Sequence, residues 1–190
     1  MNITLPDRVK LPFEFDAKQL RLNLSCIEEL IKQASSLPQN GKQHWRTIDL
    51  YHQQTAVQRA PMQSMAVNSS RPSNSYLDSA PYIQAVLNHF KCPIVNVLLA
   101  KITAHSSHSQ MASVPIDSEH GLARLYIPIT ANDEVCFVLN SVDVAMQAGE
   151  CWYLRVSDPY SVMNSSAEDK VHLIIDTRVN LWLATQLKMQ

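Results

Sequence analysis

The chain has 190 residues, a length that suits one domain, and its 46% hydrophobic content is enough for a packed core. Its 16 Lys and Arg residues nearly balance 17 Asp and Glu residues, so the sequence lacks the basic excess of proteins that bind nucleic acids or anionic membranes. Only three glycines are present, too few for the glycine-rich loops that hold nucleotide phosphates.

The N-terminal half predicts two helices separated by a strand and a long loop. Residues 9–15 are extended and apolar, and the apolar side chains that follow recur on one helix face, with Asp16 placed as the N-cap. Residues 45–51 alternate like a strand. Residues 52–75, rich in Gln, Ser, Asn and Pro, predict a loop that is either a lid over a site or a segment without function. An early proline and apolar spacing predict a second helix over residues 80–90.

The C-terminal half predicts strands separated by turn residues. The expected strands are residues 94–103, 123–129, 134–139, 142–146, 151–156 and 171–176. Short strands at regular spacing after a helical start favour an antiparallel barrel or sandwich with helices packed on it. A short helix is expected over residues 179–187. We therefore expect a single domain over residues 1–190, in which residues 1–92 support a β core formed by residues 93–190.

The first residues and the cysteines predict the compartment. The start MNITLP lacks the basic and long apolar stretches of a signal peptide, and no apolar run approaches the roughly 20 residues of a membrane span. The four cysteines are widely spaced and include no CxxC pair, which disfavours a zinc cluster. We expect a cytoplasmic protein with reduced thiols and with no nucleic-acid or membrane partner.

Five segments occur in an order and spacing that match a known family. They read LPFEFD at 11–16, EHGLARLYIPIT at 119–130, GECWYL at 149–154, PYSVMN at 159–164 and VHLIID at 171–176. With them the chain resembles the aspartyl/asparaginyl β-hydroxylases, a branch of the iron(II) and 2-oxoglutarate dioxygenases that also includes a small bacterial proline hydroxylase. The resemblance implies an α+β, mainly β fold: a double-stranded β-helix, the cupin-like jelly roll, with a ligand cavity inside and N-terminal helices packed on it.

The sequence departs from this family at the metal ligands. The resemblance implies ferrous iron held by an H-x-D element and a distal histidine, but Met111 and Ser113 occupy the H-x-D positions and Tyr160 replaces the distal histidine. A thioether is a soft ligand and a hydroxyl a weak one, so iron would lose most of its binding energy. We expect no metal and no cofactor. The alternative is an oxygenase that uses iron(II) and 2-oxoglutarate with unusual ligands, for which His105 and His108 are the fallback candidates.

The resemblance also places several polar residues inside the barrel. Arg124 matches a family arginine, Tyr126 replaces a histidine two residues later, and Lys170 replaces the arginine that grips 2-oxoglutarate. Because strand residues two apart share a face, His172 joins Lys170. We predict Arg124, Lys170 and His172 as ligand-binding residues. Tyr126 and Tyr160 are the predicted catalytic residues, and a small anionic molecule, a carboxylate or phosphate, is the predicted guest.

Each of these residues also has a structural interpretation. For Arg124 the alternative is an ion pair with Asp117 or Glu119 in place of a bound guest, and for Lys170 it is an exposed rim position. His172 is alternatively an ordinary core histidine. The two tyrosines alternatively fill the volume that the family's histidines occupy.

Three functions fit these residues. The first is a metal-independent, non-oxidative enzyme of the isomerase, lyase or cyclase type, in which phenols near fixed cations act as general acids because the positive field favours the phenolate. The second is a pseudoenzyme that binds a small acid or a partner without turnover. The third is the oxygenase with unusual ligands, which the lost ligands disfavour. The retained polar groups favour the first function, and Asp176 is expected to serve strand-end hydrogen bonding. The oligomeric state is not predicted.

Overall fold

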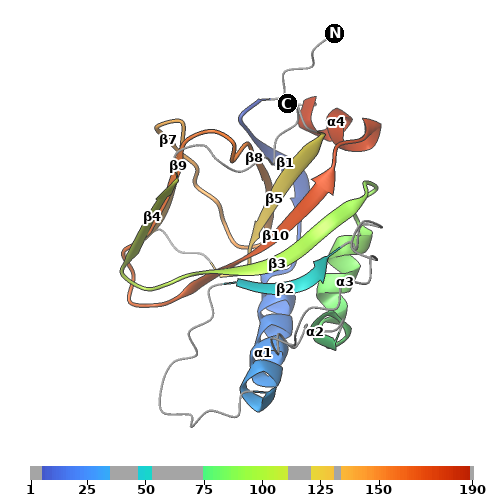
Figure 1. The fold of residues 1–190 in the computed structure, drawn as a ribbon, viewed down its shortest axis with the longest axis vertical. Helices are drawn as coiled ribbons and strands as arrows, with labels where there is room; N and C mark the ends of the chain where they lie inside the picture. Colours follow the sequence, from blue (N-terminus) through green and yellow to red (C-terminus); the bar gives the residue numbers. More distant parts are fainter. Residues whose placement is uncertain (1–5, 35–46, 53–74, 111–120, 131–133, 189–190) are drawn as a thin grey trace, which may run out of the picture.

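The computed structural model describes residues 6–34, 47–52, 75–110, 121–130 and 134–188. Within these residues the chain forms two facing antiparallel sheets (Figure 1). The larger sheet has the order β1-β8-β5-β10-β3-β2, with β1 at Arg8–Glu14, β8 at Glu150–Leu154, β5 at Leu122–Pro128, β10 at Lys170–Arg178, β3 at Ile94–Ile102 and β2 at Thr47–His52. The smaller sheet has the order β4-β9-β6-β7, with β4 at Ser106–Gln110, β9 at Tyr160–Asn164, β6 at Val135–Leu139 and β7 at Val142–Asp143.

The arrangement of β3 to β10 confirms the predicted double-stranded β-helix. Apart from the neighbours β6 and β7, which stay in the smaller sheet, consecutive strands pass between the sheets. Each sheet thus holds four of these eight strands, and β1 and β2 extend the two edges of the larger sheet. The predicted strands are present with ends shifted by a few residues, and the strand expected over 142–146 is only β7. Two further strands, β4 and β9, were not predicted. The sequence SSHSQ of β4 has no large apolar side chain, so its extended form depends on pairing with β9.

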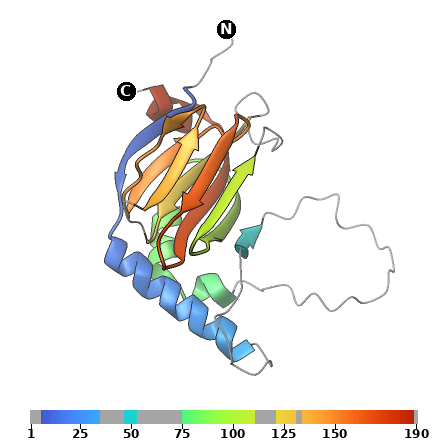
Figure 2. The same ribbon diagram turned by 90° about the vertical axis from the view of Figure 1, so that its left-hand side faces the viewer.

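Helices cover the face of the larger sheet that points away from the smaller sheet. They are α1 at Ala17–Ala34, α2 at Ser75–Asp78, α3 at Pro81–Asn88 and α4 at Leu181–Lys188. Figure 2 looks onto the smaller sheet and shows α1 at the foot of the barrel. The predicted N-cap is confirmed, because Asp16 Oδ1 accepts hydrogen bonds from the backbone N–H groups of Lys18 and Gln19 at 2.8 and 3.1 Å.

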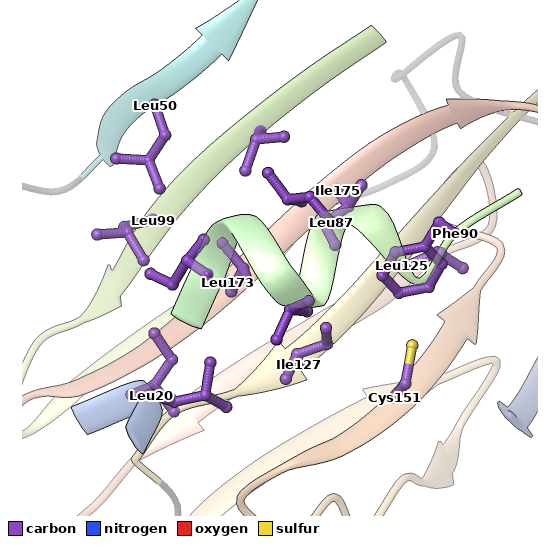
Figure 3. Close-up of a cluster of buried hydrophobic side chains, with 14 of the residues drawn as sticks. Leu20, Leu50, Leu87, Phe90, Leu99, Leu125, Ile127, Cys151, Leu173 and Ile175 are labelled. Carbon is purple, nitrogen blue, oxygen red and sulfur yellow. The ribbon is translucent and has the colours of Figure 1, made fainter. Parts of the chain in front are cut away.

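Two separate apolar cores lie on the two faces of the larger sheet. The main core lies between this sheet and the helices, where Leu87 and Phe90 pack with strand residues that include Leu125 and Ile175 (Figure 3). A smaller cluster lies between the two sheets and consists of Tyr126, Phe137, Leu139, Val144, Leu154, Val156, Val162 and Ile174. The alternation of each strand of the larger sheet therefore sends one side chain into the main core and the next toward the space between the sheets.

Several predictions from the N-terminal half and the cysteines are only partly tested by the structure. Residues 53–74 of the expected loop lie outside the described residues, so its role as a lid stays a prediction. All four cysteines are free thiols. In the described part of the chain no helix combines the length and the apolar character needed to cross a membrane.

Candidate functional site

A cavity of about 380 Å³ lies between the two sheets. Residues of β2, β3, β5 and β10 from the larger sheet and of β4, β6 and β9 from the smaller sheet form its walls. Four of the predicted site residues, Arg124, Tyr126, Tyr160 and His172, line it together. Residues far apart in the sequence therefore meet in one site, as the resemblance implied.

Strand register arranges these side chains in rows across the larger sheet. Arg124 on β5 pairs with Asp176 on β10. Two residues further along β5, Tyr126 pairs with Ile174. The next row on β10 is His172, which pairs with Ala100 on β3. Along this wall the Arg124–Asp176 pair is thus followed by Tyr126 and then by His172.

Arg124 and Asp176 form a bidentate ion pair. Arg124 Nε donates to Asp176 Oδ1 at 2.7 Å and Nη2 donates to Oδ2 at 2.9 Å. Burial opposes the charge of the guanidinium, but hydrogen bonding to Asp176 and the nearby Tyr126 outweigh it, so the pKa of Arg124 is raised. Among the described residues the partner of Arg124 is thus Asp176, so Asp176 binds an arginine side chain rather than serving only strand-end hydrogen bonding. Asp117 and Glu119 lie outside the described residues, so a pairing of Arg124 with either of them stays a prediction.

The two tyrosines lie near the Arg124 guanidinium and stay protonated at neutral pH. The Arg124 guanidinium favours the ionised form of the Tyr126 phenol, yet burial dominates and the pKa of Tyr126 is raised. Burial also raises the pKa of Tyr160, against the opposing effect of Arg124. The expectation that the positive field would lower these pKa values is therefore wrong in its net direction. Desolvation exceeds the attraction, so both phenols keep their proton at neutral pH, and their role as catalytic residues stays a prediction.

His172 is a buried, neutral imidazole. Burial lowers the pKa of its side chain from 6.5 to about 4. Its ring contacts that of Tyr126 edge to face, with centroids 6.2 Å apart. Within the described part of the chain the imidazole has no hydrogen-bond partner, although it lines the cavity.

Lys170 lies on the same sheet face but is not among the described residues that line the cavity. Its side chain is only 7% exposed, so the alternative of an exposed rim position is wrong. The Nζ atom pairs with the Glu168 carboxylate at 2.7 Å. The structure therefore does not bring Lys170 together with the other predicted site residues.

The described residues of the cavity do not match the ligand set of ferrous iron. Met111 and Ser113 lie outside the described residues. Tyr160 opens β9 opposite Gln110, the last residue of β4 and the neighbour of Met111. No Asp or Glu is among the described lining residues, and no group of three potential His, Cys, Asp or Glu ligands occurs in the described ranges. A site of two histidines and one carboxylate is therefore not formed by these residues.

The two fallback histidines lie at different places. His108 is exposed on β4 and lines the cavity, with its ring 6.4 Å from that of Tyr160. His105 is exposed in the turn before β4, where its φ is +50°, and it is not among the described lining residues. The two side chains therefore do not form a joint ligand pair on the cavity wall.

Phe137 is a cavity residue that the sequence predictions missed. Its ring is stacked parallel to that of Tyr160 with centroids 5.5 Å apart, and it contacts Tyr126 edge to face at 5.7 Å. The sequence did contain one signal for it: Phe137 lies on the expected strand over 134–139, where side chains alternate between the two faces of the sheet. This alternation alone does not say which of the two faces points into the cavity.

Comparisons with known proteins agree with this architecture. A family model described as "Aspartyl/Asparaginyl beta-hydroxylase" matches residues 16–179. A comparison with curated protein sequences finds no significant relative.

Solved structures with the same fold include oxygenases. The apo form of the non-heme monooxygenase ThoJ is 13% identical with a TM-score of 0.55, covering 91% of this chain and 74% of that protein. AviO1 from Streptomyces viridochromogenes Tue57 is 9% identical with a TM-score of 0.54, covering 93% and 91%. The viral collagen prolyl hydroxylase vCPH from Paramecium Bursaria Chlorella virus-1 is 9% identical with a TM-score of 0.51, covering 92% and 97%. At these identities the likeness extends to the fold alone.

Proposed function

Since this chain belongs to the aspartyl/asparaginyl β-hydroxylase family, we propose that it is a member that binds a small anionic molecule in its cavity without iron and without oxidation. The observation that carries the proposal is the set of groups that line the cavity. A charged guanidinium and protonated phenols provide hydrogen-bond donors there, and no acid is among the described lining residues. Such a set favours a guest that brings acceptor oxygens.

Arg124 has donors left for this guest. A guanidinium carries five N–H groups, and Asp176 takes one on Nε and one on Nη2. Tyr126 interacts with the same guanidinium through its oxygen, which leaves its own O–H proton for another acceptor. A carboxylate suits the remaining edge of the fork, because it accepts two parallel hydrogen bonds. Asp176 already balances the charge of Arg124, so directed hydrogen bonds and not net charge support this binding.

The protonation states favour binding over acid–base catalysis. Raised pKa values make Tyr126 and Tyr160 weak acids, and a lowered pKa makes His172 a weak base at neutral pH. The ligand-binding pseudoenzyme is therefore our first choice. A non-oxidative enzyme is the second candidate, supported by the neutral imidazole of His172 on the cavity wall, which can accept a hydrogen bond from a reacting group of a bound guest.

Metal analysis and turnover assays test the iron-independent part of the proposal. Protein purified aerobically, and protein reloaded with iron(II) under anaerobic conditions, is expected to hold no stoichiometric iron and to form no succinate from 2-oxoglutarate. One equivalent of iron with iron-dependent succinate formation would contradict the proposal. His108→Ala would then be the first variant to test, because His108 is an exposed imidazole that lines the cavity.

Calorimetry tests the anionic guest. Carboxylates and their matched amides, such as phenylacetate with phenylacetamide and succinate with succinamide, are titrated into the protein. At least one carboxylate is expected to bind more tightly than its amide. Arg124→Lys keeps the charge beside Asp176 but loses the planar guanidinium. This variant is expected to weaken the binding of that carboxylate by roughly 10-fold. Equal binding of acid and amide would exclude an anionic guest.

A cytoplasmic location is part of this proposal. Disulfides are rare in that compartment, and the four free thiols support it. Fractionation of cells that express the full chain is the direct check.

A further inference from the structure

We propose that the guest is an aryl carboxylate whose ring lies against Phe137 and Tyr160 and whose far end carries a hydrogen-bonding group that reaches His172. This inference rests on the proposed function, because it takes the carboxylate position at Arg124 from it. The inference adds the aromatic ring of the guest and the hydrogen-bonding group at the end of the guest remote from Arg124.

The cavity has an aromatic wall. The rings of Tyr126, Phe137, Tyr160 and His108 follow one another from the larger sheet across the smaller one, with neighbouring centroids 5.7, 5.5 and 6.4 Å apart. All four of these side chains line the cavity and come from four different strands, so the wall does not depend on one element. Two aromatic rings in offset-stacked or edge-to-face contact stabilise each other beyond what the buried area alone provides, so these side chains favour a guest that carries a ring.

The remaining inner surface is aliphatic and leaves room for a ring. Ala100, Ile102, Val162 and Ile174 line the cavity. Ala100 lies opposite His172 in the register of β3 and β10, so the smallest of these side chains faces the imidazole. A volume of about 380 Å³ falls within the roughly 300–1,000 Å³ that encloses small organic ligands.

The two polar ends of the cavity wall fix the length of the guest. Asp176, which holds Arg124, and His172 are four residues apart on β10, or about 13 Å along the strand. Arg124 also bonds to Tyr126 one row closer to His172, so the gap between the guanidinium and the imidazole is shorter than this. One benzene ring with polar groups at opposite ends suits such a gap.

His172 supplies the reason for a polar far end. In the described part of the chain the His172 nitrogens are not among the buried polar atoms that lack a partner, so they reach the cavity space, and a guest that displaces water from them must supply a hydrogen bond in its place. In the described ranges no side chain or backbone group fills that role for His172. A phenolic hydroxyl or an amine on the guest would do so.

Four probes test the inference by calorimetry: 4-hydroxyphenylacetate, phenylacetate, 4-hydroxyphenylacetamide and 2-oxoglutarate. The first is expected to bind most tightly. His172→Phe keeps a ring beside Tyr126 but removes the imidazole nitrogens, so it should weaken 4-hydroxyphenylacetate by roughly 2- to 12-fold and leave phenylacetate unchanged. Phe137→Leu should weaken both aryl acids by roughly 2- to 12-fold. Val138→Ala, its neighbour on β6 that does not line the cavity, is the control.

The outcomes separate this inference from the proposed function. If 2-oxoglutarate binds as tightly as the aryl acids, or if His172→Phe weakens phenylacetate as much as 4-hydroxyphenylacetate, the aryl inference is wrong and the anionic guest stands. If the amide equals the acid, or if no carboxylate binds, both are wrong. Where His172→Phe does not fold, as judged by its melting curve, His172→Gln is used with the same pair of aryl acids and the same expected difference.

Discussion

At the scale of single residues, the pairing of Arg124 with Asp176 determines the chemistry of the cavity. The side chains are 16% and 9% exposed, so neither charge has much access to water. A buried ion pair of this kind adds little net stability compared with apolar side chains, but each partner is costly without the other. The pair therefore holds a charged guanidinium at a place that would otherwise exclude it.

The first prediction concerns this pair. Asp176→Ala is expected to lower the free energy of unfolding by about 3–5 kcal/mol, because Arg124 remains buried without a counter-charge. Denaturation by urea measures this change. Glu29→Ala breaks an exposed ion pair with Lys32 and should change stability by less than about 1 kcal/mol. A small effect in both variants would mean that Arg124 reaches water or another acid when Asp176 is absent.

The second prediction is a pH dependence that arises from His172. Its pKa is lowered from 6.5 to about 4 in the folded chain, so between these values the unfolded chain binds more protons. The contribution of His172 to the free energy of unfolding should therefore be constant above about pH 6.5, fall by roughly 3 kcal/mol toward pH 4, and level off below, where the lowered pKa values of Asp7 and Asp158 add a separate loss of stability. In His172→Phe this loss should disappear from the urea unfolding curves. An unchanged slope between pH 6.5 and 4 would show that the imidazole is not held neutral.

At the scale of elements, a glycine joins β1, α1 and β8. Gly149 precedes β8 with φ +88°, and its carbonyl accepts a hydrogen bond from the Phe15 N–H at 2.9 Å. Its own N–H donates to the Pro128 carbonyl at 2.9 Å. A Cβ atom at this position would lie 2.1 Å from the Phe15 carbonyl oxygen, which is backbone and cannot move aside without shifting the start of α1.

The third prediction compares two glycines with similar backbone angles. Gly121 has φ +72°, but a Cβ atom there would meet nothing within 4 Å. Gly121→Ala should therefore cost only the left-handed conformation, about 1–2 kcal/mol. Gly149→Ala should cost clearly more, because the steric clash adds to the same conformational penalty. Denaturation midpoints of the two variants measure the difference, and equal costs would mean that the junction yields without strain.

At the scale of the whole molecule, the two faces of the larger sheet have different roles, one in stability and the other in ligand binding. Its helix-facing side forms the main core, and its other side forms part of the cavity wall. On β10 the alternation is strict, because Leu173 lies in the main core and the next residue, Ile174, lines the cavity. Substitutions on one face should therefore affect folding, and substitutions on the other should affect ligand binding.

The fourth prediction uses these neighbours on β10. Leu173→Ala should lower the free energy of unfolding by about 2–5 kcal/mol, since a fully buried side chain is replaced by a void. Ile174→Ala should cost less, because truncation there enlarges a cavity that already exists. Urea denaturation gives both values. A larger cost for Ile174→Ala would show that the space between the sheets is the main source of stability.

The sequence by itself determined the features that depend on local patterns. Alternation predicted most strands, apolar spacing and Asp16 predicted α1, and the five segments predicted the family and its jelly roll. These signals lie within short stretches of chain, because side-chain parity and helix capping involve residues only a few positions apart. The identity of Tyr160 at a family histidine position is likewise readable from the sequence.

Only the tertiary structure decided which residues meet and how burial changes them. Arg124 and Asp176 are 52 positions apart, and no local pattern pairs them. The stacking of Phe137 on Tyr160 and the extended form of β4 likewise depend on contacts between strands. The direction of the tyrosine pKa shifts depends on desolvation, which exists only after the two sheets have closed over the side chains.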